Sequence, residues 1–161
     1  LGFLGGCMAY TVITKPTAGT AVSKANFGDP VVDNFAYLYA LRDEAVWVPL
    51  NGAIDLAVTD LAYFRIPAKI SGSTLYSVAA HCKDASSSGA VELAVKNGAT
   101  SMLTTNITID QGEWDTSTAA VAAVIDAAHD DVATGDFIEI SVVSAGVGVT
   151  YCGVELVFRP A

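Results

Sequence analysis

The stretch "AVELAVKNG" (Ala90–Gly98) decides the fold predicted for this chain. Apolar residues occupy every second position and alternate with charged or small ones: Val91, Leu93 and Val95 on one side, Glu92, Ala94 and Lys96 on the other. A period of two is typical of a β-strand with one buried face. The Asn97–Gly98 pair that follows favours a tight turn into a second strand. The stretch therefore predicts a hairpin of an antiparallel sheet.

The same alternation recurs from about Trp47 to the last residues of the chain. It is clear in "DFIEISVV" (Asp136–Val143) and in "YCGVELVFR" (Tyr151–Arg159). The inward positions of these stretches complete a predicted core: Ile138, Ile140, Val142, Val154, Leu156 and Phe158. About eight strands separated by turn residues every 8–12 positions are typical of an antiparallel sandwich or barrel.

The Ala-rich stretch Ser117–Asp136 is ambiguous. Its alanine spacing suits a helix as well as a strand. We predict a loop, a short strand near Val121–Ile125 and a brief helical turn before Gly135. A longer helix is the alternative.

Ahead of Trp47 the pattern becomes helical. Asp29 is suited to cap a helix, and Pro30 to take its first position, where a missing N–H costs nothing. Apolar and aromatic side chains follow with helical spacing or on a second helix face: Val31, Phe35, Tyr37, Leu38 and Tyr39. We predict that residues 1–46 form an arm with a short helix and that residues 47–161 form the β-sandwich. Since so short a helix is marginal alone, it must dock on its own sandwich or on another subunit.

Composition restricts the function classes. Hydrophobic residues make up 52% of the 161 residues and charged residues 16%, and the net charge is −9. Binding to nucleic acid needs clustered Lys and Arg, whereas the eight basic residues here are scattered. No apolar run approaches the roughly 20 residues of a membrane helix. We therefore expect neither a nucleic-acid nor a membrane partner.

The first seven residues, "LGFLGGC", have two interpretations. We prefer an upstream extension ahead of a true start at Met8; a lipoprotein acylated at Cys7 is the alternative. The three cysteines show no metal-ligand spacing. We predict Cys82 and Cys152 as buried free thiols, with a disulfide between them as the alternative.

Motifs of catalysis are missing from the sequence. It holds no P-loop, no dinucleotide fingerprint and no G-x-S-x-G nucleophile elbow. His81 lies in a predicted strand, where a histidine is more often structural or at a subunit contact, and His129 lies in a predicted acidic turn. We predict no enzymatic activity, no cofactor and no metal.

Two acidic groups keep weaker alternatives open. The first group is four aspartates that would together form a Ca²⁺ site: Asp126, Asp130, Asp131 and Asp136. Their spacing matches no EF-hand loop. Glu113 and Asp115 flank Trp114, a combination that glycosidases also use. Acidic residues in a turn explain both groups more simply.

Two parts of the sequence resemble known proteins. "FRIPAKISGSTLYSVAAHCKDASSSGAVELAVKNGATSML" (Phe64–Leu103) and "ITIDQGEWDTSTA" (Ile107–Ala119) resemble jelly-roll domains of tailed-bacteriophage virion proteins. "ITKPTAGTAVSKANFGDPVVDNFAYLY" (Ile13–Tyr39) resembles the opening segment of many phage structural proteins. The resemblance implies a mainly β protein, an antiparallel jelly-roll β-sandwich preceded by an N-terminal arm and a short α-helix. It also implies a place on the virion, with assembly in the host cytoplasm.

Three functions follow as hypotheses. The first is a capsid decoration (cement) protein, a homotrimer that reinforces the shell by binding the major capsid protein through the predicted helix. The second is a tail- or baseplate-associated receptor-binding module that recognises a host surface glycan with Trp114 and Tyr151. The third is a cellular carbohydrate-binding module or secreted β-sandwich.

Overall fold

The computed structural model describes residues 42–50, 56–58 and 61–161. Asp43–Ala161 forms one compact unit. The described residues are mainly β and contain no helix, which confirms the predicted antiparallel β class. The attachment residues predicted on the N-terminal helix lie outside the described residues: Val31, Phe35, Tyr37, Leu38 and Tyr39.

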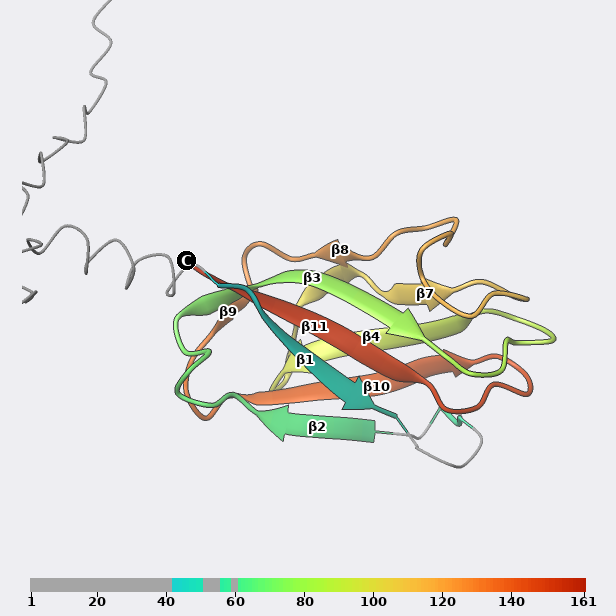
Figure 1. Ribbon diagram of the computed structural model, residues 1–161, viewed down its shortest axis with the longest axis horizontal. Helices are drawn as coiled ribbons and strands as arrows, with labels where there is room; N and C mark the ends of the chain where they lie inside the picture. The colour runs from blue at the N-terminus through green and yellow to red at the C-terminus, as the bar shows by residue number, and fades with distance from the viewer. Residues whose placement is uncertain (1–41, 51–55, 59–60) are drawn as a thin grey trace, which may run out of the picture. The chain divides into compact units, whose positions relative to one another are not determined.

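Eleven strands follow one another along the described part of the chain (Figure 1): β1 (Glu44–Pro49), β2 (Leu61–Arg65), β3 (Ser73–His81), β4 (Val91–Asn97), β5 (Thr100–Ser101), β6 (Leu103–Thr105), β7 (Ile107–Ile109), β8 (Val124–Ile125), β9 (Asp131–Val132), β10 (Phe137–Ala145) and β11 (Gly153–Pro160). Sheet A has the order β1-β11-β3-β9. Sheet B has the order β2-β10-β4-β5, and β7 also pairs with β4. The short strands β6 and β8 pair with each other.

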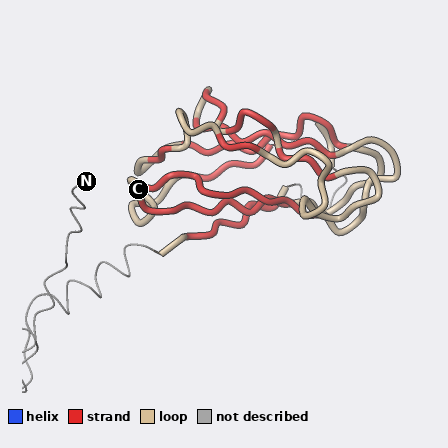
Figure 2. Tube along the Cα trace, turned by 90° about the horizontal axis from the view of Figure 1, so that it is seen from above, coloured by secondary structure: helices blue, strands red, loops and turns tan. Residues whose placement is uncertain are grey.

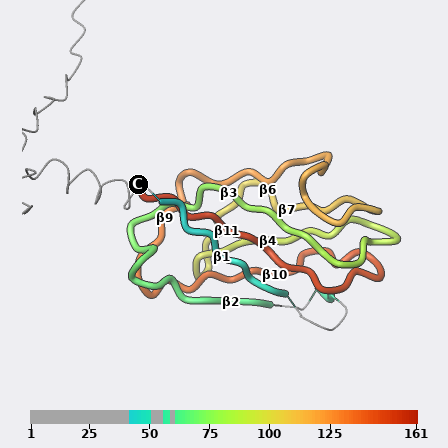
Figure 3. Tube along the Cα trace, viewed as in Figure 1, coloured from blue at the N-terminus to red at the C-terminus, as the bar shows by residue number. Residues whose placement is uncertain are grey.

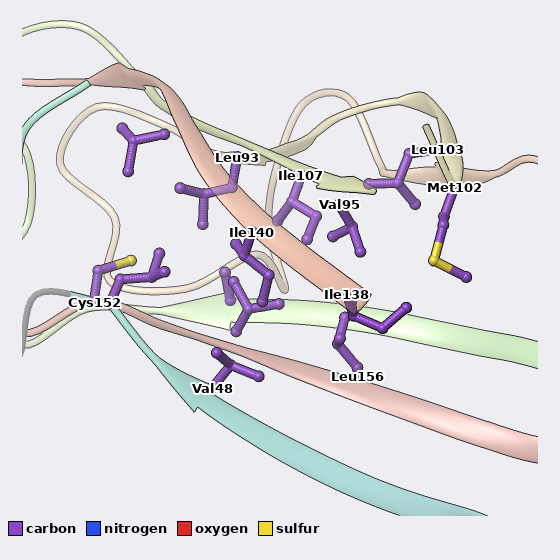
Figure 4. Close-up of a cluster of buried hydrophobic side chains, with 14 of the residues drawn as sticks. Val48, Leu93, Val95, Met102, Leu103, Ile107, Ile138, Ile140, Cys152 and Leu156 are labelled. Atoms are coloured by element: carbon purple, nitrogen blue, oxygen red, sulfur yellow. The ribbon is translucent and has the colours of Figure 1, made fainter. Parts of the chain in front are cut away.

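Strands of sheet A lie across those of sheet B, and the two layers are separate when the molecule is turned (Figures 1 and 2). Side chains from both sheets meet in one buried cluster between them (Figure 4). The core residues predicted from the alternation are confirmed, since each is at most 3% exposed: Val91, Leu93, Val95, Ile138, Ile140, Val142, Val154, Leu156 and Phe158. Burying each such side chain stabilises the fold by about 1.5–3 kcal/mol.

The hairpin predicted from Ala90–Gly98 is present. β4 ends at Asn97, and Asn97 pairs with Thr100 across the turn. Gly98 has φ 59°, a left-handed conformation that glycine adopts without steric cost. The Asn–Gly signal therefore located the turn correctly.

The Ala-rich segment forms a loop and a short strand, and the helical alternative is wrong. β8 pairs with β6, and the Asp126 amide donates to the Met102 carbonyl over 2.9 Å. β9 lies where a brief helical turn was predicted, and it pairs with β3. Neighbouring strands satisfy the backbone groups of this segment, so that local alanine spacing does not decide its structure.

The chain enters sheet A at Glu44, ahead of the predicted boundary after residue 46. Asp43 accepts two hydrogen bonds from Arg159 on β11, at 2.9 Å from Nε and 2.8 Å from Nη2. Glu44 forms an ion pair with Lys69 at 2.7 Å. The sandwich thus includes residues that the sequence had assigned to the N-terminal part.

Each of the long strands β3 and β10 contains a bulge. In β3, Ser77 pairs with Val157 but Leu75 pairs with Phe158, so Tyr76 is the extra residue. In β10 the register shifts between Val142 and Ser144. A bulge turns side chains to the other face of a sheet. It explains why Tyr76 is exposed although Val78 and Ala80, which share its parity in the sequence, are at least partly buried.

Candidate functional site on the outer face of sheet A

Trp47 and His81 form a stacked pair on the outer face of sheet A. Trp47 comes from β1 and His81 from the end of β3, and β11 runs between them. The ring centroids are 4.2 Å apart and the planes differ by 16°. Trp47 reaches across β11 because Gly153 has no side chain: a Cβ there would overlap the six-membered ring of the indole. The stack still leaves 45% of Trp47 exposed.

Lys83 and Tyr151 form a second pair beside the first. His81 pairs with Gly153, and continuing this register brings Lys83 opposite Tyr151. Lys83 Nζ lies 4.9 Å from the centroid of the Tyr151 ring, a cation–π contact. Tyr151 has φ 51°, an uncommon conformation for a residue other than glycine. Trp47, His81, Lys83 and Tyr151 are called the Trp47 platform below.

Two carboxylates lie beside the Trp47 platform. Asp115 lies opposite His81 through an isolated bridge, and Glu155 pairs with Trp47. Asp84 directly follows Lys83, so the alternation of side chains directs it away from the platform, and it accepts a hydrogen bond from the Thr150 hydroxyl. Hydrogen bonds from Ser117 lower the pKa of Asp115, and the nearby His81 adds to this effect. Asp115 therefore remains an ionised hydrogen-bond acceptor at neutral pH.

Buried polar contacts hold the loops that carry the platform. Ser86 is 2% exposed, donates to the Ser88 carbonyl at 2.8 Å and accepts from the Val147 amide at 3.0 Å. Gly146 has φ 64°, and a Cβ there would lie against Ser86. The loop after β3 is thereby fixed to the loop between β10 and β11, at the end of the sandwich where both turn (Figure 3).

Two thiols lie beneath the Trp47 platform, on the inner side of sheet A. His81 and Gly153 pair with each other; Cys82 directly follows His81, and Cys152 directly precedes Gly153. Both are buried and free, so the predicted thiols are confirmed and the alternative disulfide is not formed. Burial raises the pKa of Cys152 to about 12 and also raises that of Cys82. Both groups therefore stay neutral and behave as small apolar side chains at physiological pH.

Arg159 forms a second cluster at the other end of the outer face of sheet A. Its guanidinium carbon lies 3.1 Å from the centroid of the Tyr76 ring, and the guanidinium also donates both hydrogen bonds to Asp43. The hydrogen bond from Arg159 lowers the pKa of Asp43, and the Arg159 pKa is raised in turn. This cluster ties the start of β1 to the end of β11. Its charges already pair with one another.

The two glycan contacts predicted from the sequence lie on either side of the chain that follows β3. Trp114 is 60% exposed and Tyr151 is 46% exposed. The Cys82 amide donates to the Trp114 carbonyl, whereas Lys83 contacts Tyr151. Because Asp115 is opposite His81, the alternation of side chains directs Trp114 away from the outer face. Only Tyr151 of the predicted pair belongs to the Trp47 platform.

The acidic alternatives gain no support. Asp126 lies 2.8 Å from His129 Nδ1 and accepts from the Ala128 amide, and Asp136 accepts from the Ala133 amide and from Asn97. Among the described residues, no three His, Cys, Asp or Glu side chains gather in positions that would hold a metal ion. Asp115 caps a turn through the Ser117 amide at 2.7 Å. Local hydrogen bonds thus account for Asp115, Asp126 and Asp136.

Sequence reasoning missed Trp47 and the contact that His81 makes with it. The sequence pattern predicts Trp47 only as the first residue of the β region, and it predicts His81 as a structural or subunit-contact histidine. Their contact crosses β11, and its sequence signal is the small residue Gly153 between two stretches of larger ones. That signal has meaning only once the order of strands in sheet A is known.

The described residues hold no helix with the length and apolar character to span a membrane. Comparisons of the chain with protein-family models, with curated proteins and with solved structures found no match.

Proposed function

We propose that the protein is a non-enzymatic structural protein of a tailed-phage virion, whose sandwich is a jelly roll displayed on the particle. Strand order carries this proposal. If β1, β2, β3, β4, β7, β9, β10 and β11 are counted as first to eighth, sheet A reads first, eighth, third, sixth. Sheet B reads second, seventh, fourth, fifth. Two interleaved Greek keys produce this order, and jelly rolls of viral capsid proteins and lectins share it.

The proposed role is that of a capsid decoration protein, assembled as a homotrimer on the major capsid protein. The resemblance of Ile13–Tyr39 to the opening segment of phage structural proteins supports it. We propose that the residues before Asp43 attach the protein to the shell, because Asp43–Ala161 is a compact unit with its own core.

Truncation tests the proposed attachment. Residues 43–161 retain β1 and the Asp43–Arg159 pair, whereas a cut before Trp47 would remove half of β1. We expect this fragment to stay folded but to fail to bind particles that lack the protein, while the full chain binds them in regular copy number. Copy number is measured by quantitative mass spectrometry of purified particles, and oligomeric state by light scattering.

The substitution pair Phe35→Ala and Leu38→Ala in the full chain is the matched variant. It removes apolar side chains from the segment proposed to attach while leaving the sandwich sequence intact. Full occupancy of particles by the 43–161 fragment would place attachment in the sandwich and refute this role for the N-terminal segment.

A receptor-binding module on the tail or baseplate is the second candidate function. The observation that favours it is the Trp47 platform, which presents two aromatic rings and several polar groups on an outer sheet face. Lectins use the jelly-roll architecture for carbohydrate recognition.

A further inference from the structure

We infer that the Trp47 platform is a binding site for neutral pyranose sugars, with Trp47 as its anchor. The inference builds on the second candidate function and gives it a place, a ligand class and a specificity. It moves the predicted glycan contact from Trp114 to the outer face of sheet A.

The apolar part of the site consists of two rings held in fixed positions. Trp47 is stacked on His81, and Tyr151 lies against Lys83. His81 pairs with Gly153, and Lys83 and Tyr151 lie two residues beyond this pair on their own chain segments, so the two pairs adjoin. A pyranose ring presents an apolar face of C–H groups that packs on an aromatic ring, and two adjoining rings suit a linked pair of sugars.

The backbone is shaped to hold these rings before any ligand arrives. Gly153 leaves the space that Trp47 fills, and Tyr151 adopts a left-handed φ of 51°. Unusual backbone of this kind persists where the surrounding structure enforces it and is common at binding sites. Rings fixed in advance lose little conformational entropy on binding.

The polar rim selects the ligand class. Asp115 and Glu155 accept hydrogen bonds, and Lys83 donates them, which matches the hydroxyl groups of a sugar. Two carboxylates against one lysine repel an anionic ligand, in agreement with the chain's net charge of −9. Neutral sugars therefore fit the site, and sialylated or phosphorylated ones do not.

The two tryptophans of the chain allow a direct test. In a ¹⁵N-labelled full-length protein each gives one indole N–H signal, and Trp47→Phe and Trp114→Phe assign them. The probes are cellotriose, maltotriose, chitotriose, mannotriose and lactose, with 3′-sialyllactose as the anionic counterpart of lactose. We expect at least one neutral sugar to shift the Trp47 signal in a saturable way while the Trp114 signal stays in place.

Variants separate recognition from folding. Trp47→Ala should weaken binding about tenfold or more, as loss of an aromatic anchor does. Trp114→Ala, which removes a more exposed tryptophan outside the platform, should leave binding unchanged, and Tyr151→Ala should weaken it less than Trp47→Ala. Dispersion of the amide spectrum establishes that each variant remains folded.

Three results would overturn the inference: no shift with any neutral probe, a shift confined to Trp114, or tighter binding of 3′-sialyllactose than of lactose. Because the titration uses purified protein without particles, its outcome is independent of the attachment test. A chain that binds particles without binding sugars would keep the virion role and lose the sugar site.

Discussion

The two sheets of the sandwich have similar inner faces and very different outer faces. On sheet B, Tyr63 and Phe137 stack at 4.9 Å with Arg65 near the Phe137 ring, and they lie on regularly paired residues of β2 and β10. On sheet A the aromatic contacts depend on departures from regular structure: a glycine under Trp47 and a bulge at Tyr76. Regularly paired strands can place aromatic residues on a surface, but the contacts of Trp47 and Tyr76 also need a glycine or a bulge within the strands.

The inner faces differ in one respect. The described inner residues of sheet B are aliphatic along β4 and β10, whereas sheet A places the thiols of Cys82 and Cys152 at the end of its core. These thiols lie on the opposite side of the sheet from the Trp47 platform. The core of sheet A therefore contains buried groups that can titrate at alkaline pH.

The largest expected effect is the loss of stability at alkaline pH caused by Cys152. Its pKa is about 12 in the folded protein and near the usual value in the unfolded chain. Between about pH 9 and 12 the unfolded thiol loses its proton and the folded one keeps it, so the free energy of unfolding falls by up to about 1.4 kcal/mol per pH unit.

Chemical denaturation of the wild type and of Cys152→Ala between pH 8 and pH 11 measures this contribution as the difference between their slopes. Ile140→Val on sheet B is the control, because it costs about 0.5–1.5 kcal/mol without removing a titrating group. Equal slopes for Cys152→Ala and the wild type would show that the thiol is not shielded as the structure indicates.

The second effect is the cost of placing a side chain at Gly153. Gly153→Ala should destabilise the protein by about 1–3 kcal/mol, because the new Cβ overlaps the Trp47 ring and forces it from the sheet. In a Trp47→Ala background the same change should cost little. Thermal and urea unfolding of the four proteins of this double-mutant cycle give the coupling energy.

Ser141→Ala is the matched change on sheet B. Ser141 lies on the central strand β10 as Gly153 lies on the central strand β11, and its replacement should change stability by no more than about 0.5 kcal/mol. A coupling near zero in the Gly153 cycle would mean that Trp47 does not depend on the glycine.

The same contrast explains what could be predicted from the sequence. Alternation and turn residues are local signals, and they correctly identified the β class, the Gly98 turn and the buried positions of β4, β10 and β11. The Trp47–His81 contact joins residues brought together only by the position of β11. Tyr76 is exposed because of a bulge in β3, and this bulge depends on how β3 pairs with β11. Local patterns thus predict the layers, and pairing between distant strands creates the site.

The smallest effect distinguishes two carboxylates whose pKa values are both lowered, Asp43 on sheet A and Asp136 before β10 of sheet B. Asp43 is stabilised by a hydrogen bond and charge from Arg159, and Asp136 by hydrogen bonds from the Ala133 amide and the Asn97 side chain. Neutral donors are less sensitive to salt than a charge pair is. Raising the ionic strength should therefore move the pKa of Asp43 toward its usual value and leave that of Asp136 nearly in place.

Arg159→Lys sharpens the distinction. Lysine keeps the positive charge but cannot donate the paired hydrogen bonds of a guanidinium, so the pKa of Asp43 should rise part of the way while that of Asp136 does not change. Carboxyl ¹³C shifts followed by NMR from neutral to acidic pH report both groups in one sample. Both carboxylates have a lower pKa in the folded protein than in the unfolded chain, so each stabilises the folded state above its unfolded pKa. This stabilisation is lost as the pH falls through the pKa of the folded protein. Equal responses of the two carboxylates to Arg159→Lys would show that the Asp43–Arg159 pair does not form in solution, and the start of β1 would then be held by its strand pairing with β11 and by the Glu44–Lys69 ion pair.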